Sequence, residues 1–188
     1  NVVIYKPATP GYETAPTVII QGHMDMVCEK CPEMEHDFIK DGLKLVVKDG
    51  FLSAEGTTLG GDDGIAVAYG LALLDSTDLP HPALEVVFTV DEETGLLGAD
   101  GFDCSLLKGR RMINLDSEKE GCLWVSCAGG VAGNSYLPVR RVDASGRKVN
   151  VKVCGLVGGH SGAEIHKNRA SANILMGQFL YELSHVCG

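Results

Sequence analysis

Residues 83–95 have the sequence ALEVVFTVDEETG, in which a mainly apolar run ends in three consecutive acids. The β-branched and aromatic side chains of this run are typical of a short strand that is buried on both faces. Strands of this kind occur in parallel sheets whose faces are covered by helices, so the stretch favours an α/β fold. The acids Asp91, Glu92 and Glu93 follow directly where the predicted strand ends.

The rest of the first 128 residues supports the same fold class. Short strands are predicted at 17–22, 111–115 and 122–127, a largely buried helix at 64–74, and a β-hairpin at 43–54 with the turn Asp49-Gly50. These elements together predict a mostly parallel central sheet with a connecting helix.

The sequence pattern changes after Gly129-Gly130. Residues 148–156 alternate in the manner of a half-exposed antiparallel strand, and a helix is predicted at about 169–186. Either Asn168 or Ser171 can cap that helix. The change predicts a domain boundary near residue 129. The two predicted domains are residues 1–128 and residues 129–188.

The charge of the chain limits its partners. Its 188 residues include 16 Lys and Arg and 25 Asp and Glu, which gives a net charge of −9. An acidic chain repels phosphate backbones and anionic membrane surfaces, so we expect neither nucleic acid nor membrane as a partner. The longest uncharged stretch is interrupted by Gly and Pro, and no membrane-spanning helix is predicted. The opening at Asn1 rather than Met indicates a fragment or a processed chain.

The seven cysteines are odd in number and scattered, so they cannot all pair within one chain. Several lie in apolar runs, which favours buried free thiols in a reducing compartment such as the cytoplasm. The pair Cys28-x-x-Cys31 could indicate a zinc or redox site. A zinc ribbon needs a second pair, however, and the spacing of Cys122 and Cys127 does not match one.

Acids and one imidazole follow the ends of the predicted strands or begin the predicted helix. They are His23 and Asp25, Asp62 and Asp63, Asp91 to Glu93, and Asp116. Each alone has a simple structural explanation, as a hydrogen-bonded histidine, a helix cap, a solvated acidic turn or a loop acid. Sites in open α/β sheets form at the carboxyl ends of strands, so these groups could converge. Nitrogen and oxygen ligands without thiolate suit zinc, manganese or cobalt.

At these residues the chain resembles the aminoacyl-histidine dipeptidases, which are co-catalytic zinc peptidases related to carboxypeptidase G and aminoacylase. The matching motifs are Gln21 to Val27, Thr58 to Ile65, Thr89 to Gly95, Asn114 to Glu118 and Gly158 to His166. They occur in the family's order over nearly the whole chain. The resemblance implies an incomplete catalytic domain with a mostly parallel sheet, followed by part of an inserted α+β lid and dimerisation domain.

The resemblance implies the following metal ligands. His23 binds the first zinc and Asp25 orients its ring. Asp62 bridges both zincs, Asp116 completes the first site, and Glu93 binds the second zinc. Two zincs are implied for a complete subunit, with Co²⁺ or Mn²⁺ as possible replacements.

Two further roles follow from the same resemblance. Glu92 is implied as the general base, and His160 of the lid as the group that stabilises the tetrahedral intermediate, often in the partner subunit of a homodimer. The Asp62–Asp63 peptide bond is commonly cis in relatives. The implied reaction is hydrolysis of Xaa-His dipeptides such as carnosine, in the cytoplasm.

The chain departs from the family pattern in one respect. The family takes its last zinc ligand, a His, from a far C-terminal stretch that this chain does not include, so the second site keeps only Asp62 and Glu93. The departure leaves open whether the isolated chain is active. The alternatives are an amidohydrolase that acts on acylated amino acids, a non-catalytic fragment or dimerisation module, and a thiol-based redox protein.

Overall fold

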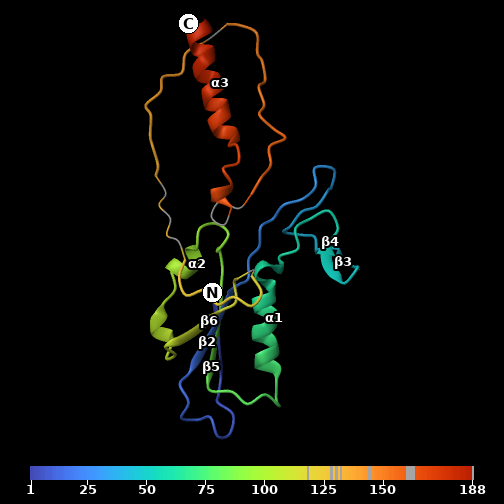
Figure 1. Cartoon of the computed structure of the whole chain (residues 1–188), viewed down its shortest axis with the longest axis vertical. Coiled ribbons are helices and arrows are strands. Elements are labelled where there is room, and N and C mark those ends of the chain that lie inside the picture. Colours follow the sequence, from blue (N-terminus) through green and yellow to red (C-terminus); the bar gives the residue numbers. More distant parts are fainter. Residues whose placement is uncertain are drawn as a thin grey trace. The chain divides into compact units, whose positions relative to one another are not determined.

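The computed structural model describes residues 1–117, 119–127, 129, 131, 133–143, 145–159 and 164–187. The chain forms two compact units, Asn1–Leu123 and Trp124–Gly188, which are described separately (Figure 1). Among the described helices, none is both long enough and apolar enough to cross a membrane.

The first unit is built on a sheet with the strand order β1-β5-β2-β6. The strands are β1 at Val2–Lys6, β5 at Leu84–Thr89, β2 at Val18–His23 and β6 at Arg111–Asn114. The β5–β2 and β2–β6 pairs are parallel and the β1–β5 pair is antiparallel. The predicted α/β class with a mostly parallel sheet is therefore confirmed. The strand β1 was not predicted.

Helix α1, at Gly61–Asp75, covers one face of this sheet. Ile20, Val86 and Phe88 form the buried core on that face, and apolar residues of the helix pack against them. The opposite side of the helix is open, since Ile65 is 54% exposed and Tyr69 is 58% exposed. The predicted helix is confirmed, but it is half-buried rather than largely buried.

The predicted hairpin is confirmed as β3, Leu45–Lys48, paired antiparallel with β4, Phe51–Ala54. Its turn residues Asp49 and Gly50 have φ angles of 52° and 81°. A tight hairpin turn of the I′ type needs positive φ at both positions, and Asp-Gly adopts it readily.

The second face of the sheet meets the segment that contains α2, Leu97–Asp100, and a 3₁₀ turn at Cys104–Leu106. Glu85 points to this face and is only 3% exposed. Its carboxylate accepts hydrogen bonds from the main-chain N–H groups of Lys108 and Gly109, at 2.9 to 3.1 Å. A buried carboxylate therefore fixes the loop that leads into β6.

Two predicted strands are wrong. Residues 122–127 and 148–156 are both described, and neither forms a strand. Alternation of side chains predicts a strand only if another segment accepts its main-chain hydrogen bonds. No strand pairs with either segment in the described parts of the chain.

The second unit contains a 3₁₀ turn at Ile165–Lys167 and helix α3 at Ala172–Cys187. The helix confirms the one predicted at about 169–186. Of the two candidate caps, Ser171 directly precedes the helix, and its hydroxyl accepts from the main-chain N–H of Ile174 at 3.5 Å. That this unit is a lid and dimerisation domain stays a prediction.

The six cysteines whose side chains are described are free, but they are not buried as predicted. Five are exposed and Cys122 is intermediate. The prediction was wrong because it placed Cys127 and Cys154 in apolar strands that do not form. Cys28 and Cys31 are exposed and lie in loops, and neither belongs to a group of possible metal ligands among the described residues.

Candidate metal centre

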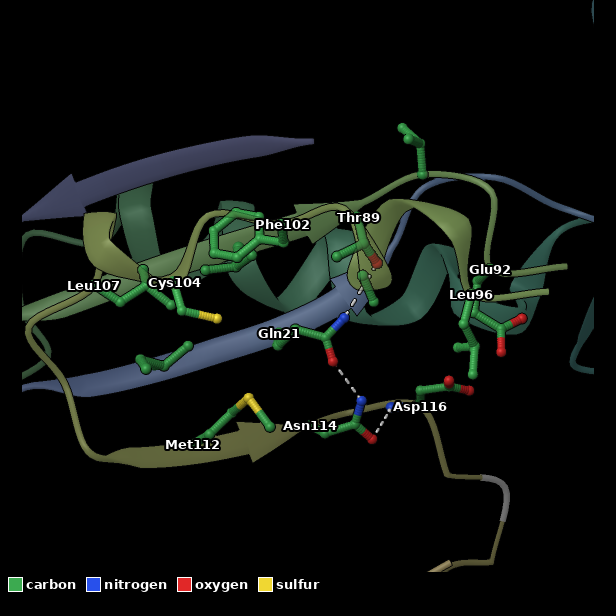
Figure 2. A pocket seen from close by; sticks show the side chains of 14 residues that line it. Gln21, Thr89, Glu92, Leu96, Phe102, Cys104, Leu107, Met112, Asn114 and Asp116 are labelled. Carbon is green, nitrogen blue, oxygen red and sulfur yellow. Dashed lines mark hydrogen bonds between the residues drawn. The ribbon is translucent and has the colours of Figure 1, made fainter. Parts of the chain in front are cut away.

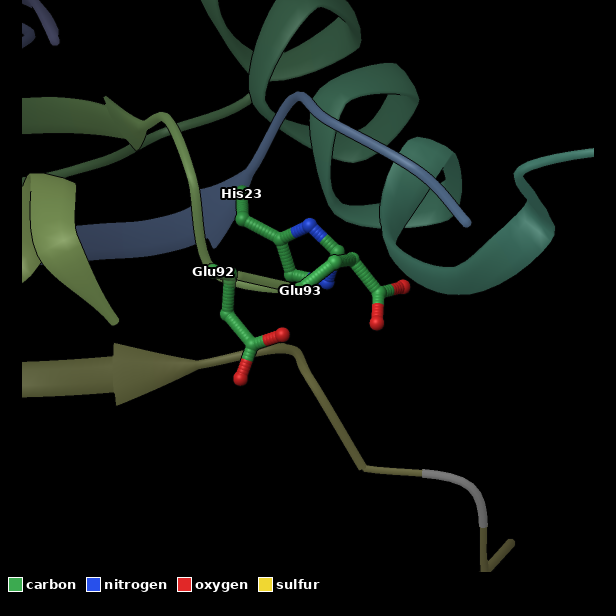
Figure 3. Close-up of side chains that lie close together, drawn as sticks. All are labelled: His23, Glu92 and Glu93. Carbon is green, nitrogen blue, oxygen red and sulfur yellow. The ribbon is translucent and has the colours of Figure 1, made fainter. Parts of the chain in front are cut away.

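Five of the predicted site residues meet at one edge of the sheet, where the parallel strands β2, β5 and β6 end. His23 is the last residue of β2, Glu92 and Glu93 follow β5, Asp116 follows β6, and Asp62 lies in the first turn of α1. Two groups of side chains could hold a metal ion, and within each group the possible ligand atoms lie within 4.8 Å of one another. One group is His23, Asp62 and Asp116, and the other is His23, Glu92 and Glu93 (Figure 3). Residues that lie up to 93 positions apart in the sequence therefore meet at the carboxyl ends of the strands, as expected for an open α/β sheet.

His23 is the centre of both groups and is held on two sides. Its ring is 1% exposed, and Nε2 lies 3.1 Å from Asp62 Oδ1. Its Nδ1 lies 3.0 Å from the main-chain oxygen of Asp25 and 3.4 Å from the Asp25 carboxylate. In a neutral imidazole the proton on Nδ1 would then point to Asp25, leaving Nε2 as the free ligand atom. The expected Asp25 contact is present, but the nearer acceptor is its carbonyl oxygen.

The charge around His23 favours its protonated form when no cation is bound. Burial lowers the pKa of the ring, but the hydrogen bond to Asp62 and the charges of Asp116 and Glu92 outweigh burial and raise the pKa above its ordinary value. A divalent cation at the same place would satisfy these acids in the way a proton does.

The Asp25 carboxylate connects His23 to the acidic loop after β5. Its Oδ2 accepts from the main-chain N–H of Glu93 at 3.1 Å. Burial raises the pKa of this carboxyl, but the main-chain N–H groups of Glu93 and Glu92 lower it further than burial raises it, so Asp25 stays ionised. An ionised Asp25 suits the proposed task of orienting the His23 ring.

The acidic loop turns sharply between β5 and α2. Asp91 and Leu96 both have left-handed backbone, with φ angles of 54° and 63°. The main-chain oxygen of Glu92 accepts from the N–H groups of Gly95 and Leu96 at 2.9 and 3.0 Å. Gly98 lies so close to the strand end that a Cβ atom would come within 2.0 Å of the main-chain oxygen of Val90. The absence of a side chain at Gly98 lets the start of α2 lie against the main chain of Val90, which directly follows β5.

Glu92 is the less exposed of the two glutamates in this loop. Burial raises its pKa, and the charges of Asp116, Glu93 and Asp62 raise it further, against the opposite effect of His23. A carboxyl whose pKa lies above the ordinary range can take up and release a proton more easily near neutral pH. The structure also places Glu92 in one group of possible metal ligands with His23 and Glu93. The sequence analysis had assigned Glu92 as the general base and not as a metal ligand.

Asp63 is a site residue whose role the sequence reasoning missed. The Asp62–Asp63 peptide bond is cis, as the resemblance implied. Asp63 is 1% exposed and its Oδ2 accepts from the main-chain N–H of His23 at 3.1 Å. Gly22 makes room for this contact, because a Cβ atom there would lie 2.5 Å from Asp63 Oδ2. Burial raises the pKa of Asp63, and the N–H of His23 opposes that effect. Only the Asp-Asp pair itself could have pointed to this role.

The donor set fits a divalent metal ion. The carboxylates of Asp62, Glu92, Glu93 and Asp116 lie near the His23 ring in two groups of possible ligands, and acids so close together need a cation or protons to offset their repulsion. The group of His23, Asp62 and Asp116 supplies three ligands, which leaves an open position of the kind that catalytic zinc sites keep. Zinc, cobalt and manganese all accept this mixture of nitrogen and oxygen.

Two cavities adjoin these acids. One of about 210 Å³ lies beside Asp62, Asp63 and Asp116. The other, of about 240 Å³, lies between the second face of the sheet and the segment at 96–107, with Glu92 and Asp116 in its lining (Figure 2). Most of its lining is apolar, and its polar side chains are those of Gln21, Thr89 and Asn114 besides the two acids.

The remaining predicted site residue, His160, lies outside the described residues, and so does Glu118 of the fourth motif. The structure therefore describes the surroundings of His23, Asp25, Asp62, Glu92, Glu93 and Asp116 only. Their roles in binding and catalysis stay predictions.

No protein-family model matches the chain. It is 41% identical to the cytosol non-specific dipeptidase of Escherichia coli (strain K12) over 182 residues, which cover 96% of this chain and 38% of that protein. It is 32% identical to the uncharacterized protein YqjE of Bacillus subtilis (strain 168) over 112 residues, or 57% of this chain and 28% of that protein.

A solved structure agrees with the sequence comparison. The aminoacylhistidine dipeptidase of Vibrio alginolyticus has 38% sequence identity and a TM-score of 0.67, covering 95% of this chain and 37% of that one. The chain therefore spans less than two fifths of the length of these two dipeptidases.

Proposed function

We propose that the chain forms the metal-binding part of a zinc-dependent dipeptidase, since it is similar to two dipeptidases over nearly its whole length. The observation that carries this proposal is the convergence of His23, Asp62 and Asp116 on one point, with Glu92 and Glu93 beside them. The proposed substrates are dipeptides of the Xaa-His type. The Vibrio relative is named for them, whereas the Escherichia coli relative is named as non-specific.

Two zinc sites are proposed for a complete subunit. His23, Asp62 and Asp116, which lie together in one group of possible ligands, would hold the first ion. Asp62 and Glu93 would hold the second. His23 can serve only one ion through Nε2, since its Nδ1 faces Asp25. Cobalt and manganese are the proposed substitutes. When bound, the metal supplies a Lewis acid that activates water and polarises the peptide carbonyl.

The protein groups have separate tasks in the proposed reaction. Glu92 accepts the proton of the attacking water and passes it to the leaving amine, for which its raised pKa is suited. Asp25 orients the His23 ring through its main-chain oxygen and its carboxylate. His160 donates a hydrogen bond to the oxyanion that develops during attack.

The second unit is proposed to act as a lid and to join two subunits into a homodimer. Its described apolar side chains give indirect support, since Tyr136, Leu137 and Val139 are 90%, 83% and 81% exposed. Exposed apolar surface of this kind often marks an interface. The name of the Escherichia coli relative supports a cytoplasmic location.

Zinc binding by matched variants tests the proposed site. Asp62→Asn removes a shared ligand, whereas Asp91→Asn removes the same charge from a neighbouring acid that belongs to neither ligand group. Asn also tolerates the left-handed backbone at position 91. In calorimetric titrations of the 188-residue chain, Asp62→Asn should abolish measurable zinc binding and Asp91→Asn should preserve it. Equal affinity in the two variants would refute the proposed ligand set.

Substrate profiling of the full-length protein separates the dipeptidase from an amidohydrolase of the same fold. A dipeptidase should cleave Xaa-His dipeptides with a free α-amine and reject their N-acetylated forms. Preferential cleavage of the acetylated compounds would overturn the proposed substrate class.

A further inference from the structure

Three polar side chains from adjacent strands form a hydrogen-bonded row in the cavity lining that also includes Glu92 and Asp116 (Figure 2). Gln21 Nε2 donates to Thr89 Oγ1 at 3.3 Å, and Asn114 Nδ2 donates to Gln21 Oε1 at 2.6 Å. Asn114 Oδ1 in turn accepts from the main-chain N–H of Asp116 at 3.2 Å. We call Thr89, Gln21 and Asn114 the polar ladder.

The direction of every bond in the ladder follows from one fixed donor. The main-chain N–H of Asp116 can only donate, so the amide oxygen of Asn114 must face it. The amide nitrogen of Asn114 then faces Gln21, which must present its oxygen there and its nitrogen to Thr89. The hydroxyl of Thr89 is left to donate to the main-chain oxygen of Gly22, at 3.4 Å.

Each member of the ladder lies two or three positions before a proposed site residue, and Thr89 is followed by Glu92 at the third position. His23 lies two positions after Gln21, and Asp116 lies two positions after Asn114. Gln21 and Asn114 are opposite one another in the β2–β6 register, as Thr89 and His23 are in the β2–β5 register. The ladder therefore ties together the three strand ends that supply the imidazole and the acids.

Core packing alone does not account for polar residues in this row. The next row on the same face pairs Ile19 with Met112, and both are apolar. Thr89 is 5% exposed, so its hydroxyl would be costly to bury without hydrogen bonds. Apolar residues in this row would need no hydrogen-bond partners, so the polar side chains indicate a role besides packing.

We propose that the polar ladder is a positioning device that sets the spacing between His23 and Asp116 and thereby the affinity of the first metal site. The inference rests on the proposed function. Its members are positioning residues, since their side chains bond to one another and to the main chain of Asp116 and Gly22. Partners behind the ligands of a metal site typically change its affinity by about 10- to 100-fold.

Two changes break the ladder while preserving the size of the side chain. Gln21→Met removes both the donor and the acceptor of the side-chain amide, and Thr89→Val removes only the hydroxyl. Thr89→Ser keeps the hydroxyl and serves as the conservative rescue. Thr9→Val is the matched control, because the Thr9 hydroxyl makes the same kind of bonds to the main chain of His81, at 2.8 and 3.1 Å, before β2 begins.

Zinc and Co²⁺ titrations of the 188-residue chain, with melting temperatures alongside, test the inference. Gln21→Met and Thr89→Val should weaken zinc binding about 10-fold or more and shift the visible absorption of bound Co²⁺. Thr89→Ser and Thr9→Val should keep the affinity and the spectrum of the unaltered chain, even if Thr9→Val lowers the melting temperature.

Two results would overturn the inference. One is unaltered zinc affinity in both ladder-breaking variants, which would leave the proposed function standing. The other is an equal loss of affinity in Thr9→Val, which would mean that general destabilisation causes the effect. An unaltered chain that binds no zinc would instead refute the proposed function, and the inference with it.

Discussion

The two units of the chain differ in whether their described apolar residues include a buried core. In the first unit Val86 and Phe88 are 0% and 4% exposed, because strands of a common sheet and helix α1 enclose them. In the described part of the second unit, Leu137 and Val139 are 83% and 81% exposed. The proposed metal ligands all lie in the unit that builds its own core. A core of that kind holds side chains at fixed distances, as catalysis and metal binding require.

This difference predicts that substitutions in the two units have different kinds of effect. Changes at the sheet edge of the first unit should alter chemistry or metal binding directly. Changes in the second unit should act through the lid or the dimer, or have little effect on the stability of the chain.

The largest effect is expected at Glu92. In the full-length protein, Glu92→Gln should lower kcat by about 10²- to 10⁴-fold and leave zinc content unchanged, because it removes proton transfer and no proposed ligand. The matched change Glu93→Gln should lower zinc occupancy. Metal analysis beside steady-state kinetics checks both. A metal-free Glu92 variant with a metal-loaded Glu93 variant would show that the two roles are reversed.

The second unit should affect chemistry through His160. In the full-length protein, His160→Ala should lower kcat by about 10²- to 10³-fold with zinc content unchanged, because it removes a donor to the developing oxyanion. Full activity in this variant would show that the second unit supplies no catalytic group through His160.

Mixed dimers sharpen the same comparison between the units. Subunits with His160→Ala, mixed with subunits with Glu92→Gln, should recover part of the activity if His160 acts in the partner's site. Such a hybrid dimer holds one site with both groups intact. Absence of recovery, with subunit exchange shown by mass spectrometry, would contradict action across the dimer.

A smaller effect is expected where the first unit is tied together by a buried acid. Glu85→Ala should lower the free energy of unfolding by about 2–3 kcal/mol, because it leaves the buried N–H group of Gly109 and the partly buried N–H group of Lys108 without their acceptor. Glu120→Ala, an exposed control in the same unit, should change it by less than about 0.5 kcal/mol. Urea unfolding measures both values, and equal losses would show that Glu85 is not a structural anchor.

The smallest effect is expected at exposed apolar positions of the second unit. Val139→Thr should change the free energy of unfolding of the 188-residue chain by no more than about 0.5 kcal/mol, since Val139 buries little surface. Val86→Thr is the contrasting change, because it places a hydroxyl in the closed core of the first unit. A loss at Val139 as large as the loss at Val86 would erase the distinction between the units.

The sequence predicted the elements whose patterns are local. The apolar run at β5, the Asp-Gly hairpin and the helix after Asp63 each show their structure within about a dozen residues. Strand β1 was missed because it is defined by pairing with β5, where Val2 lies opposite Phe88. The same dependence on a partner explains the strand wrongly predicted at 148–156.

The residues of the candidate site could be predicted from the strand-end rule and the resemblance. The buried acids that hold the surrounding main chain in place could not. His23, Asp62 and Asp116 could be expected to meet because parallel strands end at one edge. The buried roles of Asp63 and Glu85 depend on which main-chain N–H groups happen to face them. No local pattern encodes that information, since either acid alone resembles an exposed one.

X-ray absorption at the zinc edge of the zinc-loaded chain tests the central claim most directly. The proposed site predicts a first shell of nitrogen and oxygen only, at about 2.0–2.2 Å, with imidazole scattering from one histidine. That imidazole signal should disappear in His23→Ala. A shell of sulfur at about 2.3 Å would contradict the account, since it would place the ion on thiolates such as Cys28 and Cys31 rather than at the sheet edge.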